Sequence, residues 1–265
     1  MPDCLVTTDF TGEMILLGTG TSVGVPSVGC GCEVCRSPDP RNKRLRASAI
    51  LGLPEGNLLI DTSPDLRMQL LREDIGLVHA VLYTHEHADH VFGLDDLRLM
   101  QFYLDGPVPL YCEQQVEQRI RQSFDYAFTS ESQSLVPQLQ LNPIGLEPFE
   151  VLGTQITPMR LNHGTAFEVL GFRFGNIAYC TDVNHIPTES MAKLQGLDVL
   201  ILDALRVTPS KTHFTLDQAI EVAQELGAKQ TYFTHVAHEL EYHATNARLP
   251  EGMALAYDGL RIPLS

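Results

Sequence analysis

Three histidines and an aspartate fall within six residues of this sequence, in the run Thr84-His85-Glu86-His87-Ala88-Asp89-His90. A neutral imidazole nitrogen is the commonest side-chain ligand of divalent transition metals. His85 and His87 alternate and therefore point the same way at a strand end, whereas Asp89 and His90 lie where the chain turns into a helix. A solvated polar loop is the alternative, but ordinary loops favour Gly, Pro, Asn and Ser. The run therefore predicts a metal site with two ions.

Further acids and histidines stand directly after apolar runs: Asp61, His163, Asp182 and His235. Each alone could be a turn or cap residue. Their recurrence favours one shared site, because strand ends position side chains accurately. We expect His85, His87 and His163 to bind one ion, Asp89, His90 and His235 to bind the other, and Asp182 to bridge them, with room left for water.

The segment Cys30-Gly31-Cys32-Glu33-Val34-Cys35 places three of six cysteines in a glycine-containing loop. In a chain expected to be cytoplasmic, this spacing argues against disulfides and for thiolates on a tetrahedral metal, with one ligand still to be found. Three free thiols are the alternative reading. Cys112 and Cys180 lie in strand patterns and are expected to be buried small hydrophobic residues.

Composition limits the class of protein. With 265 residues and 44% hydrophobic content, the chain predicts one domain over 1–265. No apolar window approaches the roughly 18 residues of a membrane helix, and the start lacks the pattern of a secretory signal, so we expect a cytoplasmic protein with no membrane contact. A net charge of −15 opposes a nucleic-acid partner.

One short segment departs from this acidic balance. It holds five of the 18 basic residues: Arg36, Arg41, Lys43, Arg44 and Arg46. This segment is either a solvated loop or the wall of a pocket that attracts a small anionic substrate.

Strand and helix patterns alternate along the chain. Met14 begins an apolar strand run that ends in Gly18-Thr19-Gly20-Thr21, and Pro54-Glu55-Gly56 predicts a hairpin between strands 49–53 and 57–60. A helix is expected after Ser63-Pro64. The other expected strands are 78–84, 108–112, 155–161, 168–174, 177–181, 198–203, 230–234 and short strands near 253–263. The other expected helices are 93–104, 113–124, 188–195 and 215–226, and 129–147 is expected to be irregular. Two similar halves predict an α/β fold with two sheets face to face and helices outside.

Taken together, the Thr84–His90 run, Asp61, His163, Asp182 and His235 resemble the five motifs of the metallo-β-lactamase fold, over nearly the whole chain. This resemblance implies an αββα sandwich with a dinuclear centre at one edge and hydrolysis by a metal-bridging hydroxide. Four further segments are similar to the PhnP-like phosphoribosyl 1,2-cyclic phosphate phosphodiesterase subfamily: Gly18–Ser22 with the cysteine loop, Ser63–Arg67, Gly93–Arg98 and Ala256–Gly259.

The subfamily resemblance assigns further residues. It implies that His238, three residues after His235, completes a structural zinc site with the three cysteines. It also implies that His213, which otherwise reads as a loop or cap residue, points into the active site and donates a proton to a phosphate oxygen or to the leaving alkoxide. Asp61 would orient ligands or the nucleophile from behind the ligand shell. Asp61, Asp89 and His213 are thus the expected catalytic residues, and a homodimer is the expected assembly.

The same resemblance implies a small phosphate ester as substrate, such as 5-phosphoribosyl 1,2-cyclic phosphate, opened to a ribose 1,5-bisphosphate. Candidates to bind its second phosphate are Arg46, Ser48, Arg67 and Arg98. The expected cofactors are two divalent active-site ions, which can be Zn, Mn or Fe, and one structural Zn.

Three alternatives stay open at this stage. A tRNA 3′-processing nuclease of the same superfamily would need a basic arm, and no lysine- and glycine-rich insertion is present. An oxygenase or carrier of pyrroloquinoline quinone biosynthesis would bind a redox-active aromatic precursor. A metal-stabilised scaffold without activity would bind the ions but turn over no phosphate ester.

Overall fold

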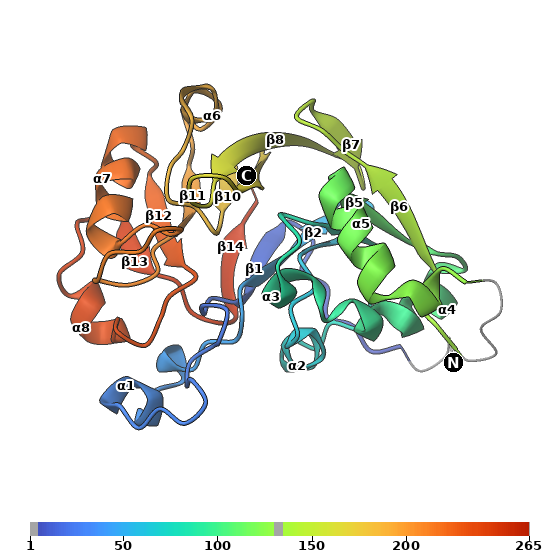
Figure 1. Cartoon of the computed structure of the whole chain (residues 1–265), viewed down its shortest axis with the longest axis horizontal. Coiled ribbons are helices and arrows are strands. Elements are labelled where there is room, and N and C mark those ends of the chain that lie inside the picture. Colours follow the sequence, from blue (N-terminus) through green and yellow to red (C-terminus); the bar gives the residue numbers. More distant parts are fainter. Residues whose placement is uncertain (1–4, 130–134, 265) are drawn as a thin grey trace.

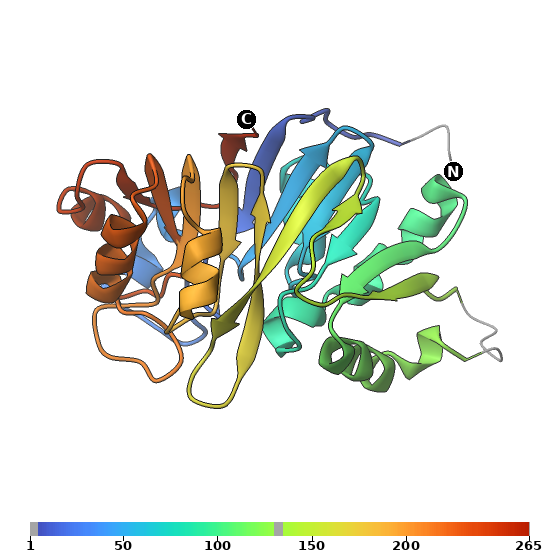
Figure 2. The same cartoon turned by 90° about the horizontal axis from the view of Figure 1, so that it is seen from above.

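Two β-sheets lie face to face in the computed structural model of the protein, which describes residues 5–129 and 135–264. Within these residues each sheet has seven strands, and helices cover the outer face of each (Figures 1 and 2). The αββα sandwich predicted from the sequence is therefore confirmed.

The first sheet comes mostly from the N-terminal half. Its strand order is β14-β1-β2-β3-β4-β5-β6. The strands are β1 (Glu13–Gly18), β2 (Ser48–Leu53), β3 (Gly56–Ile60), β4 (Ala80–Leu82), β5 (Val108–Cys112), β6 (Leu139–Pro143) and β14 (Leu260–Pro263). The helices of this half are α1 (Glu33–Arg36), η2 (Pro40–Asn42), α2 (Leu66–Arg72), α3 (Ala88–Val91), η3 (Leu94–Leu99), α4 (Met100–Leu104), α5 (Gln114–Ser123) and η4 (Asp125–Ala127).

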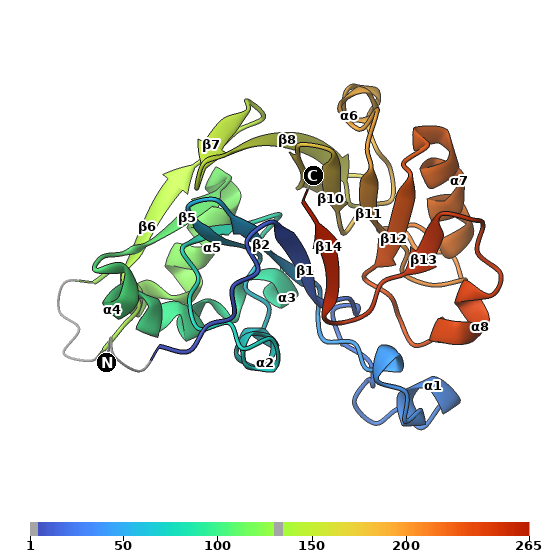
Figure 3. The ribbon, with the colours of Figure 1, turned by 180° about the vertical axis from the view of Figure 1, so that it is seen from behind.

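The second sheet comes from the C-terminal half, with the order β13-β12-β11-β10-β9-β8-β7. Its strands are β7 (Phe149–Val151), β8 (Thr154–Asn162), β9 (Glu168–Phe174), β10 (Ile177–Cys180), β11 (Val199–Asp203), β12 (Gln230–Thr234) and β13 (Met253–Leu255), with helices α6 (Thr188–Lys193), α7 (Leu216–Leu226) and α8 (Tyr242–Asn246). From behind, the C-terminal strand β14 runs beside β1, so the last strand closes onto the first sheet (Figure 3).

Strand β1 shows how the layers form. Met14 and Leu16 are buried in the cluster between the two sheets, whereas Ile15 and Leu17 are buried in the cluster under the helices of the first half. Successive side chains of a strand point to opposite faces, so a strand buried on both sides must be apolar throughout. The Met14–Leu17 run is therefore the sequence signature of a strand covered on both faces.

Two sequence expectations are wrong in detail. The segment expected to be irregular, 129–147, contains β6, which pairs in parallel with β5; residues 130–134 lie outside the described part of the chain. Leu139 and Leu141 alternate with polar residues, but this edge strand is short and ends in Pro143, so the signal is weak. The expected helix 93–104 is a 3₁₀-helix, η3, followed by α4. Strand β7 and helix α8 are short and were not predicted.

Glycine allows close backbone approach beside the site. A Cβ on Gly93 would lie 1.9 Å from the carbonyl oxygen of Ser63, and a Cβ on Gly18 would lie 1.9 Å from that of Arg46. Only glycine fits at such distances. These contacts bring α3 against the loop after β3, and the loop after β1 against the basic segment.

The carboxyl ends of several strands meet at one edge of the sandwich. β3 pairs in parallel with β4, and β10, β11 and β12 are mutually parallel, so the residues that follow them emerge on the same side. Asp61, Asp182 and His235 follow three of these strands and adopt left-handed backbone, with φ of 60°, 55° and 58°. No helix in the described residues has the length and apolar character needed to cross a membrane.

Candidate metal centre

Three imidazoles gather after β4 and β8. One ligand atom from each of His85, His87 and His163 lies within 4.8 Å of the others, and we call this set the imidazole cluster. The Nδ1 atom of His163 donates to the carbonyl oxygen of Thr212 over 2.8 Å, and Nδ1 of His85 lies 2.9 Å from Oγ1 of Thr84. Such bonds fix ring orientation and leave Nε2 free for a metal.

A second set stands beside it. Asp89, His90, Asp182 and His235 place their ligand atoms within 4.8 Å of one another and form the carboxylate cluster. Nε2 of His90 lies 3.3 Å from Oδ2 of Asp182 and 3.3 Å from Oδ2 of Asp89. Ligands bound at about 2.1 Å around one tetrahedral ion are separated by roughly 3.4 Å, so these spacings suit a single ion.

Asp182 lies between the two clusters. Its Oδ2 faces His90, while its Oδ1 lies 3.4 Å from Nε2 of His235 and 4.0 Å from Nε2 of His163. The carboxylate thus faces ligands of both clusters, in the position expected of a bridging group.

Asp61 orients a ligand of the carboxylate cluster through a hydrogen bond. Its fully buried carboxylate accepts Nδ1–H of His90 over 2.8 Å and the backbone N–H and hydroxyl of Thr84, each over 2.8 Å. Asp61 therefore directs Nε2 of His90 toward the cluster. Burial raises the pKa of Asp61, against the opposing charge of His90.

The buried atoms of the centre fit divalent ions. Nε2 of His85, Nε2 of His90 and both ring nitrogens of His235 are buried without a hydrogen-bond partner in the described residues. Burial lowers the pKa of His85, so this ring stays neutral. For His90, burial is outweighed by the carboxylates of Asp182, Asp61 and Asp89, which raise its pKa. Buried imidazole nitrogens beside several carboxylates are a donor set that suits a divalent metal.

One residue of the site, Asp203, was not predicted from the sequence. Asp203 ends β11, is fully buried, and accepts Nδ1–H of His213 through Oδ2 over 2.7 Å. His213 in turn stacks on His235, with ring centroids 4.7 Å apart and planes 12° apart. The same signal that marked Asp61 and Asp182, an acid at the end of an apolar strand, was present at Asp203.

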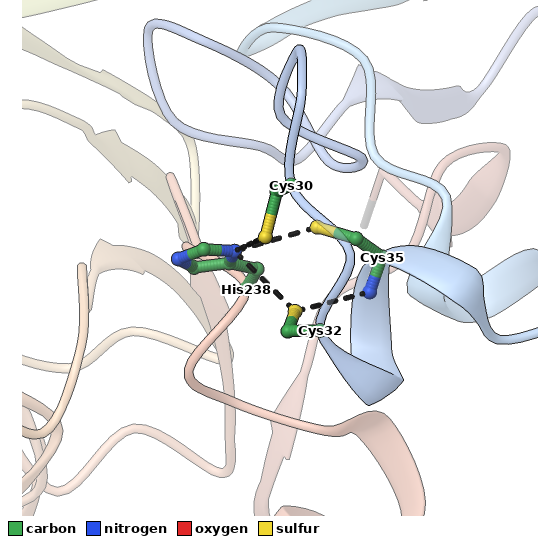
Figure 4. Close-up of side chains that lie close together, drawn as sticks. All are labelled: Cys30, Cys32, Cys35 and His238. Carbon is green, nitrogen blue, oxygen red and sulfur yellow. Dashed lines mark hydrogen bonds between the residues drawn. The ribbon is translucent and has the colours of Figure 1, made fainter.

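The cysteine loop meets His238 as expected. Sγ atoms of Cys30, Cys32 and Cys35 lie 3.2, 3.6 and 3.3 Å from Nδ1 of His238 (Figure 4). These are the separations of ligands around one tetrahedral zinc ion, roughly 3.5 Å. The backbone N–H of Cys35 lowers the pKa of the Cys32 thiol to about 7, which favours the metal-binding thiolate. We call these four residues the cysteine site.

Arg44 joins the cysteine loop to the segment that carries His238. Its buried guanidinium donates to the carbonyl oxygens of Ala237, over 3.0 Å, and Leu240, over 2.7 Å. These two carbonyls flank His238, and His235 lies just upstream. Burial lowers the pKa of Arg44 to about 10, so it remains charged at neutral pH.

The expected phosphate-binding residues make contacts with other groups of the protein. Ser48 is wrong as a ligand: its buried hydroxyl donates to the carbonyl oxygens of Ile60 and Asp61, so it faces inward. Arg67 and Arg98 line a groove between α2 and η3 that no cluster residue lines. Arg46 pairs with Asp65 over 3.0 Å and donates to the carbonyl oxygen of Ser22. The buried thiols of Cys112 and Cys180 are free, as expected.

Comparison with known proteins matches residues 56–236 to the beta-lactamase superfamily domain. A solved structure of a diphosphatase from the PhnP family shares 44% identity and a TM-score of 0.89, covering 94% of this chain and 96% of that one. The octanoyltransferase of Porphyromonas gingivalis is 38% identical over 250 residues, 93% of this chain; this chain spans about half that protein, 50% of its length. A coenzyme PQQ synthesis protein B of Methylorubrum populi is 29% identical over 222 residues, 72% of each protein.

The PhnP-family structure covers nearly the full length of both chains, and the superfamily match spans the region from Asp61 to His235 that holds the metal clusters. The resemblance predicted from the sequence is confirmed, and the chain belongs to the PhnP family of the beta-lactamase superfamily as a metal-dependent hydrolase.

Proposed function

We propose that the protein hydrolyses a small phosphodiester, with a cyclic phosphate such as 5-phosphoribosyl 1,2-cyclic phosphate as the substrate class. The observation that carries this proposal is the position of Asp182 between the imidazole cluster and the carboxylate cluster. Two divalent ions held there, Zn or Mn, would lower the pKa of a water and offset charge on the phosphoryl oxygens. We propose one further zinc ion for the cysteine site.

The charge of the centre suits a singly charged phosphate. Asp89 and Asp182 are the two carboxylates among the ligands, and they offset two of the four positive charges that two divalent ions carry. The remaining charge balances an attacking hydroxide and the single negative charge of a diester. No arginine or lysine of the described residues forms an ion pair with Asp89 or Asp182, in keeping with a substrate of low charge.

His213 and Asp203 together would act as the general acid of the reaction. Asp203 accepts Nδ1–H of His213, which fixes the ring so that Nε2 is the free nitrogen. A ring nitrogen of His213 lies within 4.8 Å of the ligand atoms of His163 and Asp182. In the protonated state His213 donates from Nε2 to the oxygen that leaves when the cyclic phosphate opens, and Asp203 stabilises the positive ring.

The test uses purified, metal-loaded protein and a ribose cyclic phosphate. The wild type should open the ring, and Asp182→Ala should lower turnover at least 100-fold. Asp198→Ala changes a partly exposed acid that pairs with Lys229; it is the matched control and should leave turnover unchanged. Absence of turnover in the wild type, or full turnover in Asp182→Ala, contradicts the proposal.

A small diphosphate is the second candidate substrate. It is favoured by the 44% identical PhnP-family relative, which is described as a diphosphatase. A diphosphate carries more negative charge than a diester and would need cations beyond the two clusters. Steady-state comparison of a diphosphate and the cyclic phosphate separates them: the higher kcat/KM identifies the substrate class. A tRNA precursor and a redox-active aromatic quinone precursor belong in the same panel and should not be converted.

We also propose that the protein forms a homodimer through the α2–η3 groove, which is lined by Leu70, Leu71, Ile75, Leu99, Met100, Arg67, Asp95, Asp96 and Arg98. Its volume is about 470 Å³. Leu71 is 57% exposed and Leu99 is 43% exposed. The groove carries two arginines and two aspartates, so it is neutral on a chain of net charge −15. Two acidic copies repel each other least across a neutral apolar face, and a two-fold axis would bring arginines opposite aspartates.

A further inference from the structure

His87 is held differently from the other ligands of its cluster. His85 and His163 each have Nδ1 within hydrogen-bonding distance of an oxygen, as does His90 in the neighbouring cluster. Neither ring nitrogen of His87 has a hydrogen-bond partner among residues 5–129 and 135–264, and the side chain is exposed. A ligand with no outer hydrogen bond is free to rotate out of position.

Phe167 covers this ring. Its phenyl ring stacks on the imidazole of His87, with centroids 4.7 Å apart and planes 4° apart. It also meets His85 and His163 edge-on, at centroid distances of 5.9 and 5.8 Å. Phe167 therefore contacts all three rings of the imidazole cluster.

The loop that carries Phe167 is itself fixed. The backbone N–H of His163 donates to the carbonyl oxygen of Phe167 over 2.8 Å, which closes the turn between β8 and β9. Gly164 takes a positive φ of 98° in this turn, and its N–H donates to the side chain of Asn184 over 2.8 Å. One loop thus sets the position of both a ligand, His163, and the phenyl ring over another, His87.

We infer that Phe167 is a positioning residue for His87: stacking holds the imidazole in its ligand orientation, in place of the hydrogen bond that holds its neighbours. Aromatic pairs in this geometry are favourable beyond the area they bury. The inference rests on the metal centre of the proposed function, but it concerns ion binding and not the substrate. It implies that loss of the ring weakens the ion at the imidazole cluster about 10- to 100-fold, the usual effect of removing an outer-shell partner.

The experiment measures metal affinity in the full-length, metal-loaded protein. Phe167→Leu is dialysed against graded chelator, and bound zinc or manganese per chain is counted by elemental analysis. One ion should leave at 10- to 100-fold lower chelator concentration than in the wild type. His87→Ala supplies the reference for loss of that ion, and cobalt substitution reports the change as an altered visible absorption band.

Two further variants separate positioning from general stability. Phe167→Tyr keeps the stacked ring and should restore wild-type affinity. Phe149→Leu makes the same change at a half-buried phenylalanine stacked on Tyr111, away from the clusters, and should bind metal as the wild type does.

The inference is overturned if Phe167→Leu retains wild-type affinity, if Phe167→Tyr binds as poorly as Phe167→Leu, or if the zinc of the cysteine site is lost in parallel. Because metal is counted directly, a protein that fails to open cyclic phosphates still gives a clear answer about Phe167.

Discussion

At the scale of single residues, the pair of Asp203 and His213 carries the sharpest prediction about chemistry. Asp203→Asn keeps an oxygen for the backbone N–H of Val183 but no longer holds a charge against Nδ1–H of His213. We expect kcat to fall about 100-fold, the lower range for loss of general acid catalysis. Steady-state kinetics on the proposed cyclic phosphate substrate measures this change.

The metal content of Asp203→Asn should stay at the wild-type value, because Asp203 belongs to neither the imidazole cluster nor the carboxylate cluster. Asp198→Asn, at a partly exposed acid beside β11, is the control. Unchanged kcat in Asp203→Asn would show that His213 does not act as the proton donor.

Residue types and strand ends predicted most of the centre. His85, His87, His163, Asp89, His90, Asp182 and His235 gather as the sequence indicated, because each is a metal-binding side chain at the end of an apolar run. Asp203 was missed although it fits the same pattern. The contact of Phe167 with His87 could not be read from spacing, since a lone phenylalanine in a loop carries no signal of what it covers.

The contacts of the residues expected to bind the second phosphate could not be predicted, for a related reason. Charge suggested Arg46, Arg67 and Arg98, but charge alone does not say which way a side chain points. Within the described residues Arg98 pairs with Asp95, and Arg46 pairs with Asp65. Each guanidinium group therefore forms an ion pair with a carboxylate close to it.

At the scale of elements, Arg44 couples the cysteine loop to the segment after β12. Arg44→Met leaves the carbonyl oxygens of Ala237 and Leu240 buried without donors. Bonds from a charged donor contribute about 1.5–3 kcal/mol each, so we expect the free energy of unfolding to fall by about 3 kcal/mol. Urea unfolding of the zinc-loaded protein measures it.

Two further variants serve as controls for the stability of Arg44→Met. Arg119→Met removes an exposed arginine on α5 and should change stability by less than about 0.5 kcal/mol. Arg44→Lys should recover only part of the loss, since an ammonium lacks the planar fork that reaches two carbonyls. Wild-type stability in Arg44→Met would show that other contacts hold the two segments together.

The same scale shows where periodicity predicts structure and where it does not. Strands β5 and β12 were predicted with their observed bounds, because β-branched, aromatic and other apolar residues recur in them between polar breaks. Strand β6 is an edge strand that pairs on one side only, and some of its residues are polar. Helix η3 is a 3₁₀-helix that begins after Gly93, and the close contact of Gly93 with Ser63 outweighs the helix propensity of the following residues.

At the scale of the whole molecule, the α2–η3 groove predicts a homodimer. Leu71→Glu places a charge in the apolar part of the groove, which is costly to bury at an interface. We expect the dissociation constant of the dimer to rise at least 100-fold, and light scattering after size exclusion to report a monomer. Val207→Glu, at a valine that is 55% exposed elsewhere, should remain dimeric. A monomeric wild type would falsify the proposed assembly.

The left-handed backbone at Asp61, Asp182 and His235 has a consequence for engineering. Residues with a side chain pay about 1–2 kcal/mol to adopt this conformation, whereas glycine and asparagine adopt it more readily. A library of variants selected for heat resistance alone would therefore drift toward glycine or asparagine at Asp182 and His235, whereas Asp61 would be kept because its buried carboxylate accepts three hydrogen bonds. Such proteins would resist heat better and hydrolyse nothing, so selection on this scaffold must score turnover and thermal tolerance together.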